Sequence, residues 1–251
     1  MRLGGALRER MRRDGCARGL ADAIKWRVDS FLSPIYLTWV PPHRWPVAIV
    51  RPQVDPMLDL LKLERLLRFV EETEEVKGDV VECGVYRGGT LLAMALRLQR
   101  MQSQRIVHGF DSFRGFPTAS AIDASGGKSA APGRLGDTTV ELVQAKVRRL
   151  RVEERVRLHP GFFKETLPML PDQPLSLAHL DCDLYQSYRT ALEHLWPKLS
   201  IGGVMVFDEF NDPKWPGGRQ AIEEFFRGQP ERPQPLAFGQ GFIRKEGRGC
   251  G

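Results

Sequence analysis

The sequence predicts an α/β fold with a doubly wound, mostly parallel sheet, and two features of the chain support this. Apolar, strand-like runs recur at residues 80–83, 105–110, 156–159, 175–180 and 204–207, with helical stretches between most of them. Alternating strands and helices are typical of a parallel sheet covered by helices on both faces. The first of these runs also passes straight into a glycine-rich turn and an apolar helix. A turn of that kind at a strand end favours ligand binding.

The chain of 251 residues is long enough for one α/β domain with additions. We expect an N-terminal basic helical arm and proline-rich lid over residues 1–56, the domain itself over residues 57–246, and a frayed tail over residues 247–251. Hydrophobic residues make up 42% of the chain and charged residues 27%, so most of it is expected to be ordered.

The remaining elements are predicted from their composition. Apolar residues recur at helical spacing over residues 57–76, which predicts a helix that leads into the first strand. Residues 118–136 are rich in Ala, Ser, Gly and Pro, which predicts a mobile loop over the site, without core residues. A short helix is expected near residues 219–227 and a last strand within residues 236–244.

No sequence feature indicates a membrane or secreted protein. No apolar run reaches the length that spans a bilayer, and no apolar segment with a cleavage site follows the N-terminal arginines. The four cysteines are dispersed, without a Cys-x-x-Cys pair: Cys16, Cys83, Cys182 and Cys250. We therefore expect reduced thiols and a cytoplasmic location.

The net charge of +6 lies largely in residues 2–27 and 146–151. Such charge can mark a nucleic-acid site, a solvated helix face or a rim that attracts an anionic substrate. Aromatic residues are not interleaved with these arginines, as base stacking would require. We therefore favour the helix face or the rim and expect no nucleic-acid partner.

The glycine turn contains the first candidate binding residues. Gly84 and Gly88 allow a tight turn and a close approach to a ligand, and the helix that follows from Thr90 directs free N–H groups at it. The spacing differs from the Gly-x-Gly-x-x-Gly of dinucleotide folds, and the acid Glu82 precedes the turn. A ligand with an amine, a carboxylate and a ribose suits this pattern. S-adenosylmethionine has all three groups.

A second candidate lies at the end of the second strand. Asp111 follows the glycine turn by roughly the distance expected of an acid that binds both ribose hydroxyls, and Ser112 stands beside it. The alternative is a turn aspartate that caps the local backbone.

Acids also follow two later, neighbouring strands. Asp181 comes after the fourth run, and Asp208 and Glu209 come after the fifth. The carboxyl ends of parallel strands meet at one edge of a sheet, and a set of oxygen ligands favours Mg²⁺ over zinc. The alternative is that these acids cap the following helices.

Five motifs in order resemble those of the TylF/MycF-type O-methyltransferases, the sugar methyltransferases of macrolide, aminocoumarin and related antibiotic pathways. They are residues 81–90 (VECGVYRGGT), 109–117 (GFDSFRGFP), 161–168 (GFFKETLP), 180–185 (LDCDLY) and the pair Asp208-Glu209. Family members carry paired aspartates where this chain has Asp208-Glu209. Residues 212–217 (DPKWPG) are similar to those of enediyne-pathway members.

The resemblance implies a class I methyltransferase fold, S-adenosylmethionine as donor, and a glycoside hydroxyl of a natural product or polysaccharide as acceptor. It also implies that Asp181, Asp208 and Glu209 bind Mg²⁺. By position, the cofactor-binding residues would be Glu82, Gly84, Tyr86, Arg87, Gly88, Thr90, Asp111, Ser112, Phe162 and Asp181. In this assignment the turn binds the methionine part of the cofactor, and Asp111 and Ser112 bind its ribose. Phe162 lies next to the adenine.

Methyl transfer requires alignment of the acceptor oxygen with the sulfonium methyl group, and removal of the hydroxyl proton. Asp181 or Asp183 is the expected catalytic base, assisted by Mg²⁺. His179 lies within a strand and is expected to be packed rather than catalytic. The arm at residues 33–46, with Tyr36, Trp39 and Trp45, could stack on a sugar or form a dimer contact.

Three other functions stay open on the sequence alone. They are a metal-independent methyltransferase of a small phenol or amine, a nucleic-acid-associated methyltransferase that uses the basic arm, and an inactive scaffold. We favour an enzyme that acts on a small glycoside and forms a homo-oligomer, with the first thirty residues as one candidate for the contact.

Overall fold

The computed structural model describes residues 60–126 and 130–247. They belong to a compact unit that spans Val54–Gly251. The expected arm and lid over residues 1–56 lie outside the described residues, and so do residues 248–251 of the expected tail. The hypotheses about sugar stacking and assembly through the arm therefore stay predictions.

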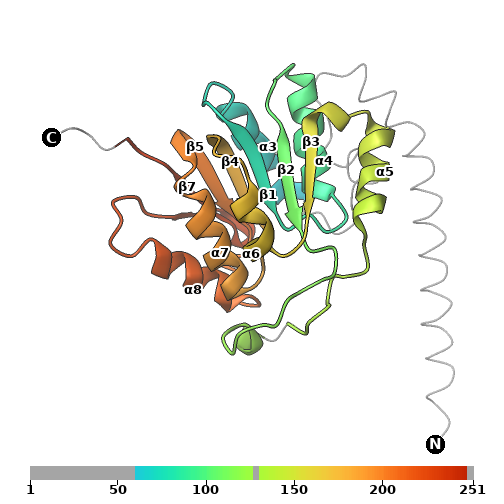
Figure 1. The fold of residues 1–251 in the computed structure, drawn as a ribbon. Coiled ribbons are helices and arrows are strands. Elements are labelled where there is room, and N and C mark those ends of the chain that lie inside the picture. Colours follow the sequence, from blue (N-terminus) through green and yellow to red (C-terminus); the bar gives the residue numbers. More distant parts are fainter. Residues whose placement is uncertain (1–59, 127–129, 248–251) are drawn as a thin grey trace, which may run out of the picture. The chain divides into compact units, whose positions relative to one another are not determined.

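Seven strands form one sheet in the order β3-β2-β1-β4-β5-β7-β6 (Figure 1). Their bounds are β1 Asp79–Cys83, β2 Val107–Asp111, β3 Val156–Pro160, β4 Leu175–Leu180, β5 Leu199–Phe207, β6 Gln234–Pro235 and β7 Gly241–Arg244. Strands β1 to β5 pair in parallel, and β7 is antiparallel to both β5 and β6. The order reverses between β1 and β4, as in a doubly wound sheet, so the predicted fold class is confirmed.

Helices cover both faces of this sheet (Figure 1). Their bounds are α3 Leu60–Glu72, α4 Gly89–Arg100, α5 Val140–Leu150, α6 Phe163–Thr166, α7 Tyr185–Leu195 and α8 Pro216–Phe225. α7 and α8 pack together over one face, where Val81, Ala178 and Met205 join their core. α3 packs against α4 on the other face. Successive strand residues point to opposite faces, so a site residue's position along its strand decides which layer it meets.

The strand predictions agree closely with the structure for β3 and β4. β2 begins at Val107, two residues later than predicted. The buried guanidinium of Arg105 donates to the carbonyl oxygens of Val70 (2.7 Å) and Thr73 (3.0 Å). Those bonds fasten the start of β2 to the end of α3.

The basic stretch at residues 146–151 lies at the end of α5, where Arg148 and Arg149 are exposed. Positive charge in the last turn of a helix is stabilised by the negative end of its dipole. This agrees with the solvated helix face that we favoured from the sequence.

The predicted loop at residues 118–136 has no strand among its described residues, but one part of that prediction is wrong. Asp123, which opens a short 3₁₀ segment (Asp123–Gly126), is only 1% exposed. A carboxylate can be buried here because backbone amides donate to it.

Two further sequence expectations concern thiols and membranes. Cys83 and Cys182 are free, buried thiols. Within residues 60–126 and 130–247, no helix is both long enough and apolar enough to cross a bilayer.

Candidate active site

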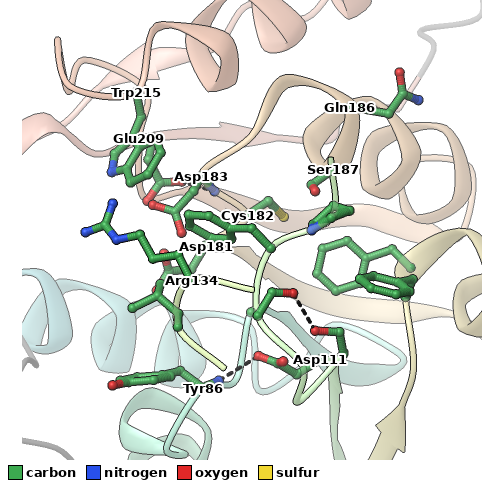
Figure 2. A pocket seen from close by; sticks show the side chains of 18 of the residues that line it. Tyr86, Asp111, Arg134, Asp181, Cys182, Asp183, Gln186, Ser187, Glu209 and Trp215 are labelled. Atoms are coloured by element: carbon green, nitrogen blue, oxygen red, sulfur yellow. Dashed lines mark hydrogen bonds between the residues drawn. The ribbon is translucent and has the colours of Figure 1, made fainter. Parts of the chain in front are cut away.

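The strand order places a crevice at the carboxyl ends of β1 and β4, because the chain leaves these neighbouring strands toward opposite edges of the sheet. A cavity of about 840 Å³ lies there. In Figure 2, Tyr86 and Asp111 lie at one end of it, Glu209 and Trp215 at the other, and Asp181 between them. One end is therefore formed by the glycine turn and the other by the β5–α8 connection.

The glycine turn can form only because Gly84 has no side chain. Its φ is 95°, and a Cβ atom at this position would lie 1.9 Å from the carbonyl oxygen of Asp181. Gly88 (φ 86°) then starts α4 in the left-handed conformation. The turn thus lies directly against the end of β4, which brings it beside the acidic motif that begins at Asp181.

Asp111 holds this turn in place. Its Oδ2 accepts hydrogen bonds from the amides of Val85 (2.9 Å) and Tyr86 (2.7 Å), and its Oδ1 accepts from the amide of Phe113 (2.7 Å). Burial nevertheless raises the pKa of Asp111 above its ordinary value. The structure thus shows a role in shaping the turn, and ribose binding by Asp111 stays a prediction.

The structure separates the predicted cofactor residues into two groups. Those that line the cavity are Gly84, Tyr86, Asp111, Ser112, Phe162 and Asp181. Those outside its lining are Glu82, Arg87, Gly88 and Thr90. Arg87 points instead to Asp137, with 2.6 Å between its guanidinium and the carboxylate, and Asp137 also accepts a bond from the Tyr86 hydroxyl (2.8 Å). These contacts of Asp137 with Tyr86 and Arg87 stabilise the turn.

Glu82 lies on the strand face toward α3 and α4 and is fully buried. Its Oε1 is 3.0 Å from Nδ1 of His179, and Nε2 of His179 is 3.9 Å from Oδ1 of Asp208. Burial would lower the pKa of His179, but the Asp208 and Glu82 carboxylates raise it to about 10. His179 is therefore packed, as expected, and links β1 to the acids at the end of β5.

The three predicted metal-binding acids converge. Asp181, Asp208 and Glu209 each offer an oxygen, and these oxygens lie within 4.8 Å of one another. Burial, and then repulsion by Asp208, raises the pKa of Asp181 to about 7. Clustered carboxylates in a buried site repel one another unless cations compensate them.

Part of that compensation comes from Lys62 on α3. Its ammonium donates to Oδ2 of Asp208 (2.8 Å), while Oδ1 of Asp208 accepts from Gln240 (2.8 Å). Burial alone would raise the pKa of Asp208, but His179 and Lys62 hold it well below its ordinary value. Asp208 is thereby fixed as a carboxylate facing the cavity.

Glu209, the departure from the paired aspartates, reaches into the same cluster because it is anchored at one oxygen. Its Oε2 accepts from the Tyr188 hydroxyl (2.6 Å) and from the amide of Asp183 (3.3 Å). Burial and the neighbouring acids Asp181 and Asp183 raise the pKa of Glu209 well above its ordinary value. The longer side chain thus bridges the ends of β4 and β5.

The far end of the cavity is aromatic. The ring of Phe116 meets Trp215 edge-to-face at 5.5 Å, and the guanidinium of Arg134 lies over the same indole at 5.6 Å. Gln186 and Ser187 of α7 also line the cavity, and Figure 2 shows them on the side opposite Trp215 and Arg134. A flat apolar wall with polar groups opposite it suits a bulky, partly polar ligand.

A family comparison decides the assignment. The chain matches the model of the family described as "Macrocin-O-methyltransferase (TylF)" over residues 55–237, a range that contains the turn, Asp111 and all three acids. This chain belongs to the TylF family.

Two relatives of this TylF-family chain are bacterial natural-product enzymes. Demethyldecarbamoylnovobiocin O-methyltransferase of Streptomyces niveus is 33% identical over 177 residues, which cover 67% of the chain and 66% of the relative. The 8-demethyl-8-(2,3-dimethoxy-alpha-L-rhamnosyl)-tetracenomycin-C 4'-O-methyltransferase of Streptomyces olivaceus is 37% identical over 162 residues, which cover 61% of the chain and 62% of the relative. The chain thus spans slightly less than two thirds of either relative.

Solved structures agree with the class I methyltransferase fold. The O-methyltransferase NovP superimposes with a TM-score of 0.70 and 25% identity, over 90% of this chain and all of NovP. The calicheamicin methyltransferase CalS11 gives a TM-score of 0.64 and 25% identity, over 87% of this chain and 91% of CalS11. The fold implied by the sequence resemblance is therefore confirmed.

Sequence reasoning missed several residues of this TylF-family site. Lys62 appeared only as one polar position in an amphipathic helix, and nothing local connects it to Asp208, 146 residues away. Arg134 fell within a segment predicted to be loop, so no pattern assigned it a contact. Trp215 was noted only within a motif, although an isolated tryptophan next to an acidic motif is a usable signal for an aromatic wall.

Proposed function

We propose that this chain transfers a methyl group from S-adenosylmethionine to a sugar hydroxyl of a glycosylated natural product, with Mg²⁺ held by Asp181, Asp208 and Glu209. The observation that carries the proposal is one cavity that joins the glycine turn to a cluster of three acids. Family membership and the activities named for the two relatives support the choice of reaction and acceptor class.

The acid cluster fits a magnesium ion. All three donors are hard oxygen atoms, and the oxygens lie within 4.8 Å of one another. Burial, and then repulsion by Asp208, raises the pKa of Asp181 to about 7, so a bound cation would stabilise its carboxylate form. A bound Mg²⁺ would supply Lewis-acid polarisation of the acceptor hydroxyl.

The chain's own residues supply alignment and proton transfer. The turn at Gly84 and Asp111 would hold the donor, and the wall at Trp215 would orient the acceptor. The acceptor oxygen attacks the methyl carbon as the carbon–sulfur bond breaks, leaving S-adenosylhomocysteine, and the hydroxyl proton passes to a carboxylate. A cation on the cluster would lower the pKa of Asp181 again, which favours Asp183, outside the cluster, as the proton acceptor.

Metal dependence separates this proposal from a metal-independent reaction. We expect methyl transfer from labelled S-adenosylmethionine to demethyldecarbamoylnovobiocin or to the rhamnosyl tetracenomycin precursor of the second relative. Dialysis against a chelator should lower the rate by at least about a hundredfold, and Mg²⁺ should restore it. Product formation is measured by scintillation counting and mass spectrometry.

The matched control is the cofactor affinity of the chelated protein, which should stay within about threefold of the untreated protein because the turn does not use the metal. Full activity after chelation would contradict the role of Mg²⁺ and favour the metal-independent alternative. Absence of transfer to glycosides, together with transfer to a simple phenol, would contradict the acceptor class.

A further inference from the structure

Asp123 is a buried carboxylate in a polar surface segment, and its contacts join two parts of the chain. Its Oδ1 accepts a hydrogen bond from the amide of Tyr185 (2.8 Å), the first residue of α7. Its Oδ2 accepts from the amide (2.9 Å) and the hydroxyl (2.6 Å) of Ser120 in its own segment. The carboxylate therefore ties the segment that follows β2 to the start of α7.

The first turns of α7 and α8 lie against this carboxylate. Leu184, the residue in the N-cap position of α7, makes no side-chain capping bond, so Asp123 supplies the cap from 62 residues away. A Cβ atom on Gly217, in the first turn of α8, would lie 2.0 Å from Oδ1 of Asp123. Both helices thus present their N-terminal turns to one anion, the end that the helix dipole makes favourable for it.

The same segment has a second attachment, at the far wall of the cavity. The Phe116 amide donates to the carbonyl oxygen of Arg134 (2.9 Å), and the amide of Gly133 donates to the carbonyl oxygen of Phe116 (2.9 Å). These bonds close the base of the segment, and Phe116 and Arg134 both contact Trp215. Asp123 lies between Phe116 and Arg134 in the sequence. It therefore fixes the middle of a segment whose two ends contribute to the aromatic wall.

The position of α7 matters for the chemistry as well as for stability. Asp183, in the left-handed conformation (φ 56°), lies two residues before the amide that Asp123 caps. Gln186 and Ser187, in the first turn of α7, line the cavity opposite the aromatic wall. A shift of this turn would change both the width of the cavity and the position of the expected proton acceptor.

We propose that Asp123 is a positioning residue for the acceptor: its carboxylate fixes the segment after β2 to the first turns of α7 and α8 and so sets the shape of the acceptor end of the cavity. The acceptor role of Asp123 rests on the proposed function. If Asp123 were only a structural cap, its replacement would lower the stability of the protein but would not weaken acceptor binding more than cofactor binding.

The test compares Asp123→Asn and Asp123→Ala with wild type. We expect the KM for the glycoside acceptor to rise about tenfold, the size expected from loss of one charge-assisted hydrogen bond. The S-adenosylmethionine Kd, measured by calorimetry, should stay within about twofold because the glycine turn is separate. Hydrogen–deuterium exchange of the Tyr185 amide should accelerate about tenfold.

Ser125→Ala is the matched control in the same segment. The Ser125 hydroxyl donates only to the local carbonyl oxygen of Ile122 (2.7 Å), so this variant should change neither the acceptor KM nor the exchange at Tyr185. If acceptor KM and cofactor Kd change together in Asp123→Asn, or if the exchange at Tyr185 is unchanged, the proposal is wrong.

Gly217→Ala approaches the same contact from α8. Its methyl group would displace the Asp123 carboxylate, so we expect the acceptor KM to rise as in Asp123→Ala, and the double variant to show less than the product of the two effects. Multiplicative effects would contradict a shared contact. If wild type methylates no glycoside, the proposed function fails, and Asp123 loses its acceptor role even if the exchange data confirm the cap.

Discussion

An Asp181→Asn variant is expected to lose methyl transfer by at least about a thousandfold while its S-adenosylmethionine Kd stays within about threefold of wild type. Asp181 lies between the glycine turn and the other two acids, and we propose that its carboxylate is one of the three ligands that hold Mg²⁺ beside the acceptor hydroxyl. Asparagine keeps the shape of the side chain but removes the charge, and an amide is a poor Mg²⁺ ligand beside two acids. Initial rates and calorimetry measure the two quantities.

Loss of folding would not explain this result. Burial and Asp208 raise the pKa of Asp181, so replacing the charged group with a neutral one should leave the Tm unchanged or raise it. Asp172→Asn is the control, because Asp172 is fully exposed and pairs only with Lys198 among the ion pairs of the described residues. Retained turnover in Asp181→Asn would remove this residue from the mechanism.

A Gly84→Ala variant is expected to be destabilised by about 3 kcal/mol and to lose measurable cofactor binding. The added methyl group would overlap the carbonyl oxygen of Asp181, at 1.9 Å, so the turn must move away from β4. That movement would also break the bonds between Asp111 and the turn. Urea unfolding gives the stability change, and calorimetry gives the affinity.

Gly228→Ala is the matched control for the conformational part of this effect. Gly228 has a similar φ of 85°, but a Cβ atom there would meet nothing within 4 Å. It should therefore cost only the strain of a left-handed residue, about 1 kcal/mol, and leave cofactor affinity unchanged. Equal destabilisation of both variants would show that the close approach at Gly84 is not tight.

The sequence predicted those features that depend on local patterns. Alternating apolar runs located strands β1 to β5, and the spacing of Gly84 and Gly88 located the turn. Parallel strands end at the same edge of a sheet, and this rule correctly brought Asp181, Asp208 and Glu209 together. Each inference needed only neighbouring residues and a general rule of sheet topology.

Features that depend on distant contacts could not be predicted. The sequence does not reveal that the strand face of Glu82 turns it toward His179, 97 residues away, instead of the cavity. The sequence left open whether Asp111 binds a ribose or caps the local backbone, and it did not reveal that the carboxylate also binds the amides of Val85 and Tyr86, 26 and 25 residues away. Asp123 was assigned to a mobile loop over the site, because nothing in the neighbouring sequence indicates the helix that it caps.

S-adenosylmethionine binding tests the central claim most directly. Calorimetric titration of wild type and Asp111→Ala, each with and without Mg²⁺, should give a wild-type Kd of about 1 to 100 µM, the usual range for enzyme ligands. The Asp111→Ala affinity should fall by at least about a hundredfold, because two amides of the glycine turn and the amide of Phe113 lose their acceptor. Absence of binding to wild type under both conditions would contradict the assignment of this cavity to a methyltransferase.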